Sequence, residues 1–167
     1  MTNSLKPLQA DKSIMYEVSR EFEFSYTHRL WLYNGKCSNL HGHNGKVCVT
    51  LAQESLDESG LSVDFHQMKQ TIESWVEENW DHKTFLNSAD PLLAILTKAG
   101  VDCVSFDCNP TSEQFARLIY LQAKSMGLPV KSVDFWETSK CMARYCPEKK
   151  KGSSDKLAPK KPLAISR

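Results

Sequence analysis

Large apolar side chains occupy alternate positions in residues 16–26, which read YEVSREFEFSY. The apolar set consists of Tyr16, Val18, Phe22, Phe24 and Tyr26. A period of two residues predicts a β-strand with one face buried and the other in water. Such strands are typical of antiparallel sheets, so this stretch constrains the fold more than any other part of the chain.

The rest of the chain is predicted to supply three more strands. Valine and leucine alternate with other residues over 46–52, which predicts a second strand. The segment before it contains NGKCSNL, and its asparagine and glycine predict a loop. Strand patterns return over 130–139 and, more briefly, over 142–145.

Helical spacing separates the two pairs of strands. It predicts a long helix over 64–80, a short one over 90–100 and a second long one over 111–127. Thr111 and Gln114 fit a capping box at the start of the last helix. The order β-β-α-α-β-β, with the short helix left aside, predicts an α+β fold in which an antiparallel sheet carries helices on one face.

Length and composition suit a single globular domain with a real core, because 41% of the 167 residues are apolar. We expect the domain over 14–147, a flexible N-terminus over 1–13 and a disordered tail over 148–167. The tail has seven Lys or Arg and two acidic residues, whereas the first 147 residues have 14 basic and 18 acidic ones. We interpret the tail as a solubilising end and expect no direct nucleic-acid binding.

The compartment follows from what the chain lacks. No apolar run is long enough to span a membrane, and the N-terminus does not resemble a signal peptide. We therefore expect a cytoplasmic protein with no membrane partner and with six mostly reduced cysteines. The pairs Cys103/Cys108 and Cys141/Cys146 are interpreted as ordinary small buried residues rather than as a second metal site.

Residues 37–44 read CSNLHGHN and place two histidines around one glycine. In a strand, His41 and His43 point to the same side, and Gly42 leaves that side unobstructed. His28 continues the inward parity of the first strand. Three imidazoles with an open fourth position are typical of a catalytic zinc site, whereas a structural site has four protein ligands.

Cys37 has two interpretations that its spacing does not separate. As a fourth ligand it would close the site, and the protein would be a zinc-binding scaffold. As a thiol that the metal leaves free, it would act as a base or nucleophile.

Two further features suggest acid–base or recognition chemistry. Asp81 precedes His82, and a carboxylate can fix the tautomer of an imidazole. The alternative is that both residues simply belong to a polar loop after a helix. Glu137 shares the parity of Val133 and Phe135, so its carboxylate is predicted to point inward and to need a partner. A ligand with two N–H donors would serve, unless a twist or bulge exposes Glu137.

Six motifs, taken together and in order, resemble the 6-pyruvoyltetrahydropterin synthase family over about residues 14–146. They are FSYTHRL, CSNLHGHN, VDF, DHKTFLN, NPTSE and WETS. The resemblance implies the tunnelling (T-fold) architecture, in which subunits oligomerise so that their sheets form a β-barrel. It also implies active sites at the subunit interfaces.

The interval between Cys37 and His41 distinguishes members of the family. Animal pyruvoyl enzymes have five residues between the cysteine and H-G-H, and this chain has three. Three resembles the 6-carboxy-5,6,7,8-tetrahydropterin synthases of the queuosine pathway. That likeness implies conversion of 7,8-dihydroneopterin triphosphate to 6-carboxytetrahydropterin, with release of acetaldehyde and triphosphate. A pyruvoyl-type elimination on the same scaffold is the alternative.

The resemblance also implies roles for the histidines and the thiol. His28, His41 and His43 would hold Zn²⁺, which polarises the substrate carbinol. Cys37 would be the base that removes the proton.

Five further residues take roles from the same resemblance. Asp81 and His82 would complete the proton relay. Glu137 would bind the pterin amino group and ring N–H, and Thr111 and Glu113 would line the pterin pocket.

Two departures from the family pattern stand out. Family members usually have an aromatic residue after H-G-H-N, where this chain has Gly45, so looser packing is expected there. The connection over 90–108 is longer than in the shortest members and is expected to affect the barrel rim or the oligomer.

Overall fold

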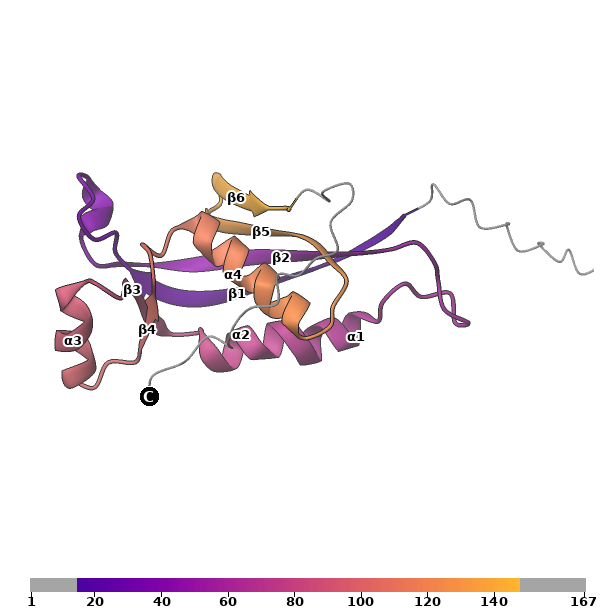
Figure 1. Cartoon of the computed structure of the whole chain (residues 1–167), viewed down its shortest axis with the longest axis horizontal. Coiled ribbons are helices and arrows are strands. Elements are labelled where there is room, and N and C mark those ends of the chain that lie inside the picture. The colour runs from indigo at the N-terminus through magenta and orange to yellow at the C-terminus, as the bar shows by residue number, and fades with distance from the viewer. Residues whose placement is uncertain (1–14, 148–167) are drawn as a thin grey trace, which may run out of the picture.

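The computed structural model describes residues 15–147, so the predictions for 1–13 and 148–167 lie outside the described residues. One curved sheet contains six strands in the order β4-β3-β1-β2-β5-β6 (Figure 1). Their bounds are β1 Tyr16–His28, β2 His41–Gln53, β3 Lys83–Asn87, β4 Cys103–Phe106, β5 Val130–Thr138 and β6 Cys141–Tyr145. The four strands expected from the sequence are β1, β2, β5 and β6, and they pair in antiparallel fashion.

The prediction of a purely antiparallel sheet is wrong, because β3 and β4 make the sheet mixed. β3 runs parallel to β1, and β4 runs parallel to β3. Thr84, Phe85 and Leu86 of β3 are buried in succession, so the strand has no alternation to reveal it. Such continuous burial is typical of parallel strands that are covered on both faces.

The predicted helices are present. The first runs without a break through α1 (Phe65–Met68), the π-helical turn η2 (Lys69–Glu73) and α2 (Ser74–Asn79). The others are α3 (Pro91–Lys98) and α4 (Ser112–Ser125), and a short 3₁₀ turn, η1 (Lys36–Ser38), precedes β2. No helix within 15–147 has the length and apolar character needed to cross a membrane.

The capping box predicted for α4 does not form. Thr111 is the N-cap residue, but its hydroxyl makes no capping hydrogen bond. Its carbonyl instead accepts hydrogen bonds from the amides of Gln114 and Phe115. Thr111 lines a cavity described below.

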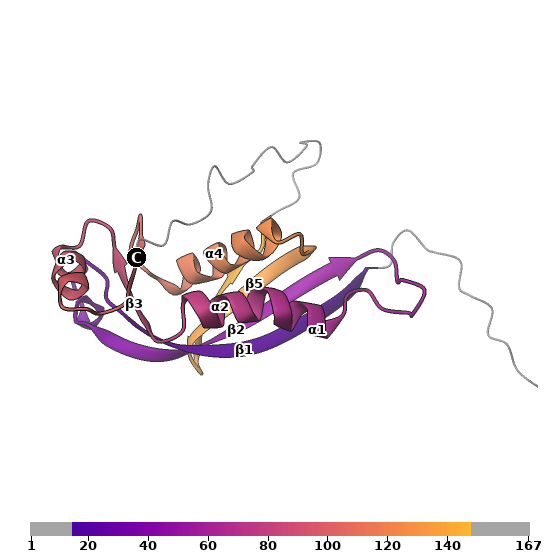
Figure 2. The same ribbon diagram turned by 90° about the horizontal axis from the view of Figure 1, so that it is seen from below.

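Helices α1, α2 and α4 cover one face of the sheet, as Figure 2 shows. Between helices and sheet lies a cluster of aromatic rings, in which Phe115 of α4 stacks on Phe135 of β5 with centroids 4.8 Å apart. Burying one such side chain contributes about 1.5–3 kcal/mol. The other face is polar: Ser19 hydrogen-bonds Thr50 at 2.9 Å, and Lys46 pairs with Glu21 at 2.8 Å. The predicted alternation of buried and wet positions is confirmed.

The expectation of loose packing at Gly45 is wrong. A Cβ atom added at Gly45 would lie 2.7 Å from Cζ of Phe135 and 3.0 Å from Cε1 of Tyr26. Tyr26 belongs to the neighbouring strand, so its ring fills space that an aromatic residue at position 45 would otherwise use. Glycine is required here by this close approach.

We predict that Gly45→Ala destabilises the fold by about 1–3 kcal/mol, because the added methyl group overpacks the core. Urea denaturation of both proteins measures the loss. If the clash is the cause, Phe135→Leu and Gly45→Ala together will cost less than the sum of the two single changes. Additive losses would contradict this explanation.

Candidate active site

Strand register brings the three predicted histidines together. His28 of β1 lies opposite His41 of β2, and Tyr26 lies opposite His43. The three imidazole centroids are 4.6, 4.9 and 5.2 Å apart. One donor atom from each of His28, His41, His43 and Glu137 falls within 4.8 Å of all the others, and this is the metal-capable group found among the described residues.

Hydrogen bonds from the far side of two rings orient their free nitrogens. Nδ1 of His28 donates to the carbonyl of Pro110 at 2.8 Å, and Nδ1 of His41 donates to the carbonyl of Asn39 at 2.8 Å. In both rings Nε2 is then the unprotonated nitrogen, which is the form that binds a metal. Backbone carbonyls are common second partners of metal-binding histidines.

Two of the histidine nitrogens lack a hydrogen-bond partner in the described part of the chain. Nε2 of His28 and Nε2 of His43 are both buried and unsatisfied. Nε2 of His43 lies 3.3 Å from Oε1 of Glu137, at an angle that makes no hydrogen bond. A buried unpaired polar atom costs about 1–3 kcal/mol, and a metal ion would remove that cost. The donor set therefore fits a divalent metal that prefers imidazole, such as Zn²⁺.

Burial keeps these imidazoles neutral. It lowers the pKa of His28 and of His43, and the nearby negative charge of Glu137 opposes this shift without cancelling it. Neutral imidazole is the ligating form, so His28 and His43 would bind a metal near pH 7 without first losing protons.

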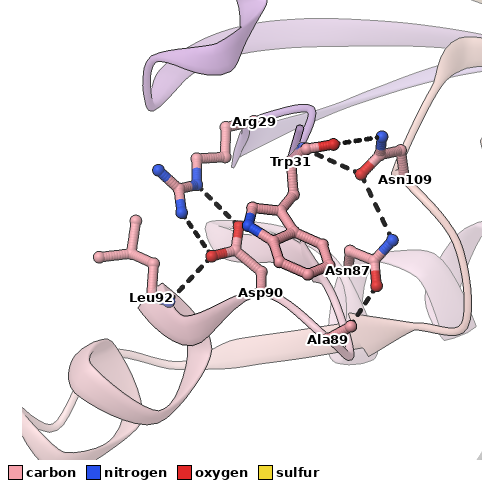
Figure 3. Close-up of polar contacts among 7 residues, drawn as sticks. All are labelled: Arg29, Trp31, Asn87, Ala89, Asp90, Leu92 and Asn109. Atoms are coloured by element: carbon pink, nitrogen blue, oxygen red, sulfur yellow. Dashed lines mark hydrogen bonds and ion pairs between the residues drawn. The ribbon is translucent and has the colours of Figure 1, made fainter. Parts of the chain in front are cut away.

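An asparagine clamp, formed by Asn109 on the backbone of Trp31, lies next to the carbonyl that orients His28 (Figure 3 shows the clamp). Oδ1 of Asn109 accepts from the amide of Trp31 at 3.0 Å, and its Nδ2 donates to the carbonyl of Trp31 at 3.0 Å. Asn87 supports Oδ1 of Asn109 at 3.4 Å. The clamp joins the segment after β1 to the segment before α4, and so fixes Pro110 against His28.

The long 90–108 connection reaches the same region. Arg29, next to His28, binds the carboxylate of Asp90 through both Nε, at 2.7 Å, and Nη2 (Figure 3). The Asp90 side chain is fully buried and also caps α3 through the amide of Leu92. The Arg29 guanidinium holds the pKa of the Asp90 carboxyl below its usual value. The connection therefore provides a second contact, in addition to the Asn109 clamp, that fixes the segment after β1.

A cavity of about 320 Å³ opens beside His28. It is lined by four other residues that the sequence predicted for the site: Cys37, Thr111, Glu113 and Glu137. Cys37 lies in η1 and is not in the metal-capable group. This placement favours a thiol beside the metal over a fourth ligand.

Two outcomes were predicted for Glu137, an inward carboxylate with a partner or exposure through a bulge, and the structure shows part of each. The ladder between β5 and β6 is irregular between Trp136 and Thr138, and the Glu137 side chain is 24% exposed at the cavity. Its Oε2 accepts a hydrogen bond from the hydroxyl of Ser112 at 2.8 Å. The sequence analysis missed Ser112, and its place inside NPTSE was the only signal that could have found it.

Asp81 and His82 form the predicted pair but do not line this cavity. Nδ1 of His82 donates to Oδ2 of Asp81 at 2.7 Å, and Oδ1 of Asp81 accepts from the amide of Ser25 at 2.8 Å. Burial alone would raise the pKa of Asp81, but these hydrogen bonds outweigh it and lower the pKa. His82 has φ +59°, an uncommon conformation for a residue other than glycine, and its side chain is 79% exposed.

The surroundings of Asp81 are separate from the metal group. A second cavity, of about 260 Å³, is lined by Asp81 together with Glu21, Glu73 and Glu77. None of the three histidines lines it. Within one chain, the acid–base pair and the candidate metal centre therefore occupy different places.

The cysteine pairs do not behave as one group. All six cysteines are free. Cys103 and Cys108 are half-buried, whereas Cys141 and Cys146 are exposed, so the expectation of burial is wrong for the second pair. That pair lies on β6 and just after it, at the edge of the sheet.

The fold and the site define a class of α+β proteins in which a curved mixed sheet, covered by helices on one face, carries a histidine-rich centre. The model of the 6-pyruvoyl tetrahydropterin synthase family matches residues 17–148. This chain therefore belongs to that family, and the resemblance noted in the sequence is confirmed.

Individual relatives agree with this assignment. The chain is 35% identical over 104 residues to the 6-carboxy-5,6,7,8-tetrahydropterin synthase of Rickettsia bellii, covering 61% of this chain and 75% of the relative. It is 31% identical over 136 residues to the enzyme of the same name from Synechocystis sp., covering 78% and 93%.

Solved structures show the same fold. An uncharacterized protein from Wolinella succinogenes superposes with a TM-score of 0.68 at 28% identity, covering 81% of this chain and 100% of the other. The 6-pyruvoyl tetrahydropterin synthase of Caenorhabditis elegans gives 0.62 at 24% identity, covering 83% and 99%, and supports the fold alone.

We predict that the metal-free protein loses stability as the pH falls below the ordinary histidine pKa of 6.5. The lowered pKa values of His28 and His43 mean that the unfolded chain binds more protons there, so acid favours unfolding. Above that pH these two groups are neutral in both states and contribute no pH dependence. Urea midpoints between pH 5 and 8 measure the effect.

The matched variants are His28→Gln and His66→Gln, because His66 is exposed on α1. The first should flatten the pH dependence and the second should leave it as in the wild type. An unchanged slope in His28→Gln would contradict the assignment of a buried neutral imidazole.

Proposed function

We propose that this protein converts 7,8-dihydroneopterin triphosphate to 6-carboxy-5,6,7,8-tetrahydropterin, acetaldehyde and triphosphate in a zinc-dependent reaction. One water is consumed, because the new carboxylate contains one oxygen more than the carbinol from which it forms. The observation that carries the proposal is a single cavity at which His28 of the metal-capable group meets Cys37 and Glu137.

Two observations favour the carboxy product over the pyruvoyl product. Three residues separate Cys37 from His41, as in the carboxy-type enzymes that the sequence resembles. The relatives from Rickettsia bellii and Synechocystis sp. are named 6-carboxy-5,6,7,8-tetrahydropterin synthase. A product of this kind would enter 7-deazaguanine synthesis for tRNA modification, in the cytoplasm.

The residues of the site divide the work. His28, His41 and His43 hold the ion, which when bound polarises a carbinol oxygen and acidifies the adjacent C–H. Cys37, which lines the same cavity, takes that proton as general base.

Recognition of the pterin falls to Glu137 and its neighbours in the same cavity. Glu137 accepts hydrogen bonds from the pterin amino group and ring N–H, and the Ser112 hydroxyl holds its second oxygen in place. Thr111 and Glu113 line the pocket beside it. A carboxylate that accepts two parallel N–H bonds gives both orientation and specificity.

The second half of the proton relay comes from another copy of the chain in this proposal. Asp81 lines a different cavity within its own chain and the His82 side chain is 79% exposed, so the pair would reach a substrate across an interface. Two strand edges are suited to such an interface. Among the described residues, β1 pairs with β3 only over Tyr26–His28, which leaves the same edge without a strand partner over 16–25. β6 is the far edge of the sheet.

Pairing the free edge of β1 with β6 of a second copy would continue the sheet and close a ring. Unpaired strand edges are liabilities that closed barrels remove. The Asp81 pair takes up both backbone groups of Ser25, where the free edge of β1 ends. Ring closure would thus bring it toward the neighbour's β6, whose residues Cys141 and Met142 line the metal cavity.

We predict that Cys37→Ala binds zinc like the wild type and loses turnover by about 10²–10⁴-fold, the usual contribution of a general base. Zinc content and the product mass, after incubation with dihydroneopterin triphosphate, are the measurements. The wild type should release 6-carboxytetrahydropterin. A pyruvoyl product, or loss of zinc from Cys37→Ala, would contradict the proposal.

We also predict that inactive Cys37→Ala and inactive His82→Ala proteins restore activity when they are refolded together. Random mixing in a closed ring leaves about one quarter of the interfacial sites with both groups intact. Steady-state activity of the mixture, against each variant refolded alone, is the readout. No recovery in a mixture shown to be co-assembled would place both groups in one subunit and contradict the shared site.

A further inference from the structure

The hydroxyl group of Tyr26 has no hydrogen-bond partner in the described part of the chain, although Tyr26 is only 3% exposed. Leaving a buried hydroxyl unpaired costs about 1–3 kcal/mol. A phenylalanine would fill the same space without that cost. The hydroxyl therefore needs a partner that residues 15–147 do not supply.

The surroundings of Tyr26 indicate where that partner lies. Its ring centroid is 5.1 Å from that of His28 and 5.6 Å from that of His43, the residue opposite it in the sheet. The other buried unsatisfied side-chain atoms between residues 15 and 147 are Nε2 of these same two histidines. Three neighbouring side chains thus lack a partner in one place, and the negative charge of Glu137 reaches the hydroxyl as well.

The ring cannot turn away to find water. Cε1 of Tyr26 lies 3.0 Å from where a Cβ of Gly45 would stand, and Phe115 packs against the ring with centroids 4.8 Å apart. Phe135 closes a further side at 5.9 Å. Close packing of this kind fixes the direction of the hydroxyl.

A neutral phenol both donates and accepts one hydrogen bond. Its natural partner beside a metal held by imidazoles is an oxygen atom in the open coordination position, from water or from a substrate hydroxyl.

We propose that Tyr26 is a further residue of the candidate active site, whose hydroxyl hydrogen-bonds to the oxygen ligand that the loaded metal centre carries. The inference rests on the proposed metal site but not on the proposed reaction. The sequence pattern does not indicate this role, because Tyr26 occupies an apolar position in the alternation of the strand.

Tyr26→Phe tests the proposal, with Tyr145→Phe as the control for loss of a phenol packed on Tyr120 outside the site. Melting temperature without metal and zinc affinity by competition with a chelator are measured for all three proteins. Without metal, Tyr26→Phe should be at least as stable as the wild type, because no hydrogen bond is lost. Its zinc affinity should fall about five- to tenfold, the value of one hydrogen bond. Tyr145→Phe should keep the wild-type zinc affinity.

Two results would overturn the inference. Lower stability of metal-free Tyr26→Phe would show that the hydroxyl already has a partner within the fold. Wild-type zinc affinity in Tyr26→Phe would show that it does not serve the loaded site.

The test also separates this inference from the proposed function. If zinc binds and Tyr26→Phe weakens it while no pterin is turned over, the inference stands and the proposed reaction fails. If the wild type binds no zinc, both fail.

Discussion

The register between β1 and β2 is the constraint on which the rest of the structure depends. It sets His28 opposite His41 and Tyr26 opposite His43, on the face that the helices cover. Because side chains alternate between faces, a slip of one residue would move one strand's histidines to the polar face and dissolve the group. The metal-capable site is therefore a direct consequence of pairing two long strands, each of 13 residues.

Several contacts stabilise this register, whereas the polar atoms of the site lower the local stability. The aromatic core fixes the strands against α4, and the Asn109 clamp and the Arg29–Asp90 pair fix the segment that follows β1. Against this, the site contains three buried polar atoms that have no hydrogen-bond partner within residues 15–147. A ligand that binds only the folded state repays such a cost by mass action. The unsatisfied atoms of the site therefore lower the stability of the protein, and a bound metal ion would restore it.

The sequence predicted the parts of this site that follow from simple periodicity. Period two identified β1 and the inward direction of His28, His41 and His43, and helical spacing identified the covering helices. β3 was not predicted because its buried residues follow one another without alternation, and β4 was not predicted because four alternating residues are too few to identify a strand. Two other features depend on contacts between distant segments: the hydrogen bond from Ser112 to Glu137, and the filling of the space above Gly45 by Tyr26. No local pattern contains such information. The family resemblance supplied the roles of Asp81 and His82, but only the structure shows that they lie away from the metal group within one chain.

X-ray absorption spectroscopy of the zinc-loaded wild-type protein tests the central claim most directly, namely that three imidazoles hold the ion and Cys37 does not. The account predicts three nitrogen neighbours at about 2.0–2.1 Å with one oxygen, and no sulfur. A sulfur neighbour at about 2.3 Å would place Cys37 on the metal and contradict both its role as base and the open coordination position.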